Sequence, residues 1–89
     1  MREVFTEGMI DFINEEYKKL KRKIIKSILI VSPDLDFDEL FDNHNVNQLR
    51  LIDMYLRLGF SFKQAENISM MGLYPKEFNK IVRMAEKNE

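Results

Sequence analysis

Apolar residues in the first third of the chain recur every three or four positions, the period of one face of an α-helix. The stripe consists of Met9, Ile13, Tyr17, Leu20, Ile24, Ile28 and Val31. It predicts an amphipathic helix over residues 9–31, roughly 35 Å long. Pro33 ends it, because proline cannot continue the helical hydrogen bonds. Such a long rod in a short chain suggests that a second copy covers part of the stripe, so a homo-oligomer through residues 9–31 is predicted.

The next segment, residues 32–46, reads as an acidic linker. Asp34 or Asp36 is positioned to cap a short helix that turns Leu40 and Phe41 inward. The asparagine-rich stretch around His44 then predicts a turn, with Asn45 or Asn47 as the next helix cap. We expect His44 itself to lie in solvent within this turn.

Residues 47–87 divide into three short helices. Gly59 and Gly72 occupy positions typical of left-handed helix ends, and Pro75 suits the first residue of the last helix. Ser61 begins the middle helix with a capping box that Gln64 completes. The last helix is expected to face the core with Phe78, Ile81, Val82 and Ala85. Since no strand pattern is present, the sequence predicts one all-α domain over residues 1–89, a small helical bundle.

The composition argues against catalysis and metal binding. The 89 residues include 14 Lys and Arg, 15 Asp and Glu, one His and no Cys, with a formal net charge of −1. Without cysteine there are no disulfides, thiolate nucleophiles or Cys-based metal sites. The acids after Pro33 do not form a calcium loop, because Glu39 and Asn45 replace its glycine and its bidentate glutamate. With no phosphate-binding or nucleophile motif either, we predict a non-enzymatic protein with no metal and no cofactor.

Apolar runs in the sequence are short. The longest, residues 24–31, is interrupted by Lys26, whereas a membrane span needs roughly 20 apolar residues. The first residues mix acids with apolar side chains, unlike a secretory signal. These features predict a cytoplasmic protein without membrane association.

Charge is distributed unevenly along the chain. Residues 17–31 hold six bases and no acid, and residues 32–46 hold five acids and no Lys or Arg. On a helix, one side of the basic block would present Lys18, Lys19, Arg22 and Lys26. These blocks could pair internally, or the basic side could bind an acidic partner, a nucleic-acid backbone or a phosphorylated ligand.

Two family resemblances overlap on residues 47–86. Leu58-Gly59-Phe60-Ser61, followed by Ala65, resembles the first-loop signature of ubiquitin-associated (UBA-like) modules. That resemblance implies an apolar patch that grips a partner protein, with Leu58, Gly59 and Phe60 on one edge and Val82 on the other. A helix cap at Gly59 and a core position at Phe60 would explain the same residues.

The second resemblance is to the helix-turn-helix of DNA-binding regulators. The stretch Gly72 to Ile81 is similar to its turn and recognition helix, although Ile68 lies where that motif normally has alanine. The resemblance implies that the last helix meets nucleic acid with Lys76, Asn79, Lys80, Arg83 and Lys87. A solvated basic face explains the same side chains, and the net charge of −1 lacks the basic excess typical of DNA binders.

The favoured interpretation is a protein-interaction module, acting as a small adaptor, inhibitor or regulator of another macromolecule. Its predicted contact residues are Leu58, Gly59, Phe60 and Val82, together with Lys18, Lys19, Arg22 and Lys26. The alternative is a nucleic-acid-binding regulator that uses the last helix. A further alternative is an oligomer that binds an anionic small molecule or nucleotide at an interface lined by the first helix.

Overall fold

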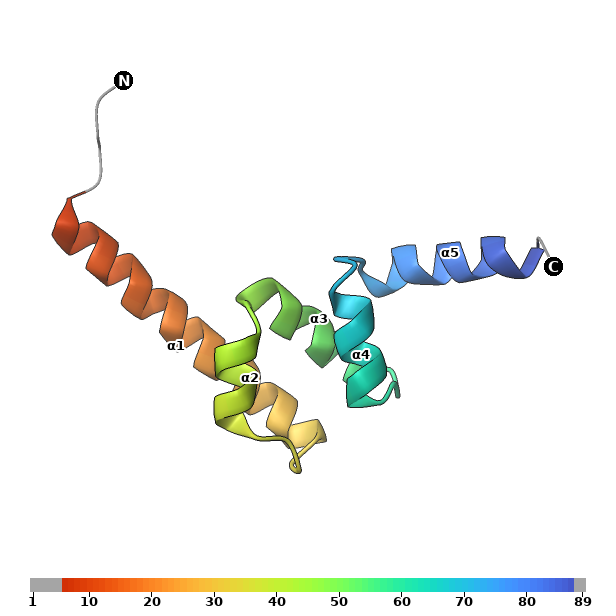
Figure 1. The fold of residues 1–89 in the computed structure, drawn as a ribbon, viewed down its shortest axis with the longest axis horizontal. Helices are drawn as coiled ribbons and strands as arrows, with labels where there is room; N and C mark the ends of the chain where they lie inside the picture. Colours follow the sequence, from red (N-terminus) through yellow and green to blue (C-terminus); the bar gives the residue numbers. More distant parts are fainter. Residues whose placement is uncertain (1–5, 88–89) are drawn as a thin grey trace, which may run out of the picture.

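A computed structural model describes residues 6–87, and within that range the chain forms five helices and no strand (Figure 1). The helices are α1 (Glu7–Val31), α2 (Phe37–Asn43), α3 (Val46–Arg57), α4 (Phe62–Ser69) and α5 (Pro75–Lys87). The all-α prediction, with a long N-terminal helix, is therefore confirmed. None of the described helices has the length and apolar character that crossing a bilayer requires.

Local signals in the sequence set most helix ends. Asp36 caps α2 by accepting a hydrogen bond from the Glu39 backbone N–H at 3.1 Å. Asn45 and Ser61 begin α3 and α4 with complete capping boxes, in which the side chain three residues later returns the hydrogen bond. After these helices Gly59 and Gly72 adopt φ of 101° and 71°, the left-handed region that glycine enters without strain. The segment predicted as an acidic linker, residues 32–46, contains α2.

The core lies where α3 packs between the second half of α1 and α4. Ile25 and Ile28 of α1 are completely buried against this core, as are Leu49, Ile52 and Tyr55 of α3. Leu51 of α3, Leu40 of α2 and Ala65 and Ile68 of α4 complete the buried cluster. Because α3 has 12 residues and α1 has 25, α3 can cover only about half of α1.

Two helical segments extend away from this core, at opposite ends of the molecule (Figure 1). They are the first part of α1 and most of α5. The radius of gyration is 16.6 Å, whereas a compact 89-residue domain would have about 12 Å. The expectation that Ile81, Val82 and Ala85 face the core is wrong, because α5 leaves the core after Phe78 and no described helix lies alongside its remainder.

Candidate partner-binding surfaces

The N-terminal overhang, defined as residues 7–16 of α1, continues the face of α1 that binds α3. The Tyr17 hydroxyl accepts a hydrogen bond from the backbone N–H of Val46, the first residue of α3, at 3.3 Å. Before this point every α1 residue is exposed, including Phe12 with 66% of its surface accessible. The exposed apolar side chains are Met9, Ile10, Phe12 and Ile13. The overhang is therefore an amphipathic helix whose apolar face has no described neighbour.

At the other end of the molecule, α5 is anchored by an aromatic cluster. The Phe78 ring meets Tyr55 and Phe60 edge to face, with ring centroids 5.7 and 6.0 Å apart. Tyr55 and Phe60 form a third edge-to-face pair at 5.5 Å. Each such pair contributes about 0.5–1.5 kcal/mol beyond the area it buries. The cluster fixes the start of α5 against α3.

A partly buried hydrogen bond reinforces this anchor. The Tyr55 hydroxyl donates to the backbone carbonyl of Leu73, in the turn before α5, at 2.7 Å. Burial raises the pKa of the Tyr55 hydroxyl above its usual value, and the nearby negative charge of Glu77 raises it further. The hydroxyl therefore stays protonated and able to donate throughout the neutral range.

The C-terminal overhang, defined as residues 79–87 of α5, leaves its apolar side chains in solvent. Ile81 has 51% of its surface accessible, and Met84 and Val82 are exposed as well. Ala85 lies in the same exposed stretch. Within one turn the helix face thus changes from the packed Phe78 to an uncovered apolar stripe.

The predicted UBA-like patch is divided between core and surface. Phe60 belongs to the aromatic cluster and is partly buried, which fits its reading as a core residue. Gly59 ends α3 in the left-handed conformation. Leu58 and Val82 are exposed and remain available to a partner. The structure brings Phe60 next to α5 through Phe78.

A basic groove lies on the side of α5 away from its apolar stripe. Four of the five residues predicted for nucleic acid, Lys76, Asn79, Lys80 and Arg83, line this groove together. The fifth, Lys87, is exposed four residues after Arg83. The turn between α4 and α5 spans residues 70–74, slightly longer than the 3–4 residues of a typical helix-turn-helix.

The basic residues predicted on α1 form a separate, exposed surface. Lys18 and Lys19 pair with Glu15 and Glu16 of the same helix, at 3.7 and 3.0 Å. Two bases of α1 make cation–π contacts with Phe41 of α2. The Lys21 Nζ atom lies 4.4 Å from the centre of the Phe41 ring, and the Arg22 Cζ atom lies 5.9 Å from it. Of the alternatives left open for the two charged blocks, internal ion pairing is not seen among the described residues, because α2 presents the Phe41 ring to Lys21 and Arg22.

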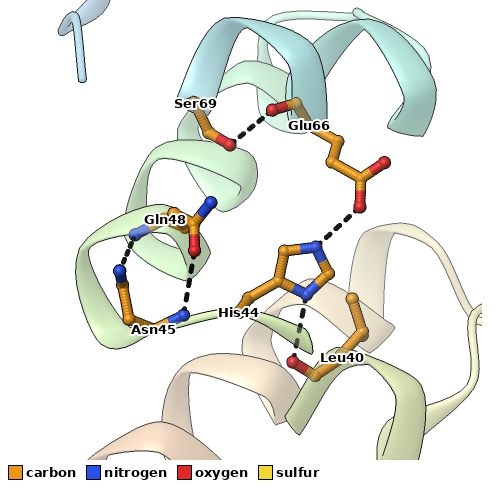
Figure 2. Close-up of polar contacts among 6 residues, drawn as sticks. All are labelled: Leu40, His44, Asn45, Gln48, Glu66 and Ser69. Carbon is orange, nitrogen blue, oxygen red and sulfur yellow. Dashed lines mark hydrogen bonds and ion pairs between the residues drawn. The ribbon is translucent and has the colours of Figure 1, made fainter. Parts of the chain in front are cut away.

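His44 is buried, contrary to the prediction from the sequence. It is 7% exposed and joins two helices through hydrogen bonds at both ring nitrogens (Figure 2). Nδ1 lies 3.1 Å from the Leu40 carbonyl oxygen, and Nε2 lies 2.7 Å from a Glu66 carboxylate oxygen. A carbonyl oxygen can only accept, so His44 donates to Leu40 from Nδ1, and Nε2 and the Glu66 carboxyl group share the second hydrogen bond. The expectation of a solvated turn is wrong because α4 brings Glu66 over His44 from 22 positions away.

The surroundings of His44 have few groups for chemistry. A cavity of about 70 Å³ adjoins the ring and is lined by the polar side chains of Asp36, Glu39, Asn43 and Glu66. It has no hydroxyl or thiol nucleophile among its lining residues. Throughout residues 6–87, no three His, Asp or Glu side chains gather in a way that could hold a metal ion. Through its two hydrogen bonds, His44 clamps α4 to the α2–α3 junction.

Comparison with known proteins gives no match: no family model, no curated protein and no solved structure is detectably similar to this chain.

Proposed function

We propose that this chain is a non-enzymatic protein-interaction module that binds an amphipathic helix along the apolar stripe of α5. The observation that carries the proposal is the contrast within α5 between the anchored Phe78 and the uncovered Ile81 and Val82. Regulators and adaptors commonly recognise helices in this way, through apolar residues spaced three and four apart.

The energetics support an interaction surface at α5. A helix of 13 residues is marginal in water by itself, since most helical stability in proteins comes from packing one face. The described contacts pack only the first turn of α5. Contiguous apolar side chains left in solvent mark interaction sites in soluble proteins more often than isolated ones do. A partner helix on the stripe would stabilise α5 and bury these side chains together.

A photo-crosslinking amino acid tests the proposal. Placed at Ala85, on the apolar stripe, it should yield a protein adduct in the native cell, whereas the same group at the exposed Lys63 on α4 should not. The stripe variant Val82→Lys should abolish the adduct, while the neighbouring Asn79→Lys should preserve it. An adduct that survives Val82→Lys would contradict binding along the stripe.

The basic groove favours a second candidate function, contact with a nucleic-acid backbone. Lys76, Lys80 and Arg83 stand along one side of α5 and face solvent, an arrangement suited to phosphate contact. A fluorescent duplex should then bind with an affinity that falls steeply as salt rises, and the double variant Lys80→Glu/Arg83→Glu should abolish binding. A crosslinker at Lys80 that captures nucleic acid would favour this function over the protein-interaction module.

A further inference from the structure

The two overhangs share one property: each continues a packed helix face beyond the end of the core. The N-terminal overhang extends the α1 face that α3 covers up to Tyr17. The C-terminal overhang extends the α5 face that Phe78 anchors to Tyr55. They are ten and nine residues long, or about 14–15 Å of helix each. Two apolar helical faces of matching length thus lie unpartnered in one chain.

The overhangs cannot cover each other within one molecule, because they lie at opposite ends of the fold (Figure 1). In a pair of chains related by a two-fold axis, each N-terminal overhang can meet the C-terminal overhang of the other chain. This arrangement makes the same contact twice and closes the assembly at two subunits. It uses both exposed stripes and leaves neither for unlimited association.

Net charge distinguishes this pairing from pairing of like overhangs. The N-terminal overhang carries four acids, Glu7, Asp11, Glu15 and Glu16, and no base. The C-terminal overhang carries three bases, Lys80, Arg83 and Lys87, and one acid, Glu86. Like overhangs brought together would place charges of one sign side by side, whereas unlike overhangs attract. Most of these charges lie away from the apolar stripes, so they remain solvated and favour the pairing through the opposite net charges of the two overhangs.

The predicted association of two chains through the whole of residues 9–31 is less favourable. In an antiparallel α1–α1 pair, the N-terminal overhang would face the second half of the partner's α1. That half already buries Ile25 and Ile28 against its own core. The stripe of the overhang would therefore meet a helix whose apolar face is largely occupied.

We propose that the partner of α5 is a second copy of this chain, in a two-fold dimer that packs the α1 overhang of each chain against the α5 overhang of the other. This inference rests on the proposed function, since it names the amphipathic helix that the α5 stripe binds. The interaction module would then function as a dimer, with the basic groove of each α5 on its outside.

Sedimentation equilibrium of the purified full-length chain tests the dimer. We expect a dimer for the natural sequence, and Ile13→Glu or Ile81→Lys should each raise its dissociation constant by about 30-fold or more. Both positions are about half exposed, so neither change should unfold the chain, which circular dichroism checks. Matched controls place the same charges on other faces of the two helices: Asn14→Glu and Asn79→Lys should leave the dimer intact.

Mixing the two defective variants identifies the contact. An Ile13→Glu chain with an Ile81→Lys chain has one intact contact of α1 with α5, and the other contact places Glu near Lys. The mixture should therefore dimerise about tenfold or more tightly than either variant alone. If the natural chain is still monomeric at about 100 μM, the inference is overturned. An Ile81→Lys variant that still dimerises would also overturn it, and would indicate pairing of α1 with α1.

These outcomes separate the inference from the proposed function. If the chain is monomeric and a crosslinker at Ala85 captures a different protein, the second copy is excluded and the interaction module stands. If the crosslinker at Ala85 captures nothing and both defective variants still dimerise, the α5 stripe is not a binding surface, and the proposed function and the inference fail together.

Discussion

The two halves of α1 carry the same apolar periodicity and have opposite surroundings. Ile25 and Ile28 in the second half are completely buried, whereas Phe12 and Ile13 in the first half are exposed. The difference arises from α3, which begins beside Tyr17 and runs along the second half alone. An amphipathic pattern therefore indicates that a helix needs a partner face, and the length of its neighbours determines where that face is covered within the chain.

The largest effect on stability is expected when one large apolar side chain is removed from each half of α1 in turn. Ile28→Ala should lower the free energy of unfolding by about 2–5 kcal/mol, because it removes buried contacts and leaves a cavity. Ile13→Ala should change it by about 0.5 kcal/mol or less in the monomer. Urea denaturation at concentrations below self-association measures both. Equal losses would mean that the overhang packs against the core in solution.

The clamp between His44 and Glu66 should show the next largest effect, because it ties α4 to the core. Removing His44 leaves the Glu66 carboxylate and the Leu40 carbonyl without their partner, which costs about 1–3 kcal/mol for buried groups. A double-mutant cycle with His44→Ala and Glu66→Ala measures the coupling. Independent, additive effects would show that the hydrogen bond adds nothing to stability.

Removing the Tyr55 hydroxyl, which anchors α5, should have a smaller effect on stability, and that effect should depend on pH. Tyr55→Phe removes the hydrogen bond to the Leu73 carbonyl and should destabilise the fold by about 1 kcal/mol. Since the pKa of Tyr55 in the folded chain exceeds its unfolded value of 10.0, its contribution is complete below pH 10 and is lost as the pH rises through the folded value. The difference in stability between the natural chain and Tyr55→Phe should therefore shrink above pH 10. A difference that is constant up to pH 11 would refute this assignment.

The smallest effect is expected at the cap of α1, and a cap of the core provides the comparison. Asn45→Ala breaks the capping box of α3 inside the core and should cost about 1 kcal/mol. Thr6 caps α1 at the tip of the overhang, where its side chain accepts from the Met9 N–H at 3.2 Å. Thr6→Ala should fray the first turn and speed its amide hydrogen exchange, with little change in global unfolding. If both variants lower global stability equally, the overhang unfolds together with the core.

Much of the fold could be predicted from the sequence because its signals are local. The caps at Asp36, Asn45 and Ser61 and the helix ends at Gly59 and Gly72 each depend on residues within one turn. The candidate sites were less accessible to prediction. His44 lies in a polar turn, and nothing near it in sequence indicates that Glu66 covers it. The exposure of Ile81 and Val82 does not follow from their helical periodicity, which predicts only that they share a face.

The sequence by itself determined the secondary structure of this protein: where five helices begin and end, and which side of each is apolar. These properties follow from backbone geometry and from hydrogen bonds between residues three or four apart. Only the tertiary structure decided which apolar sides are covered. That outcome depends on which helices lie side by side, a non-local property, and within residues 6–87 it leaves the apolar stripes of residues 7–16 and 79–87 uncovered.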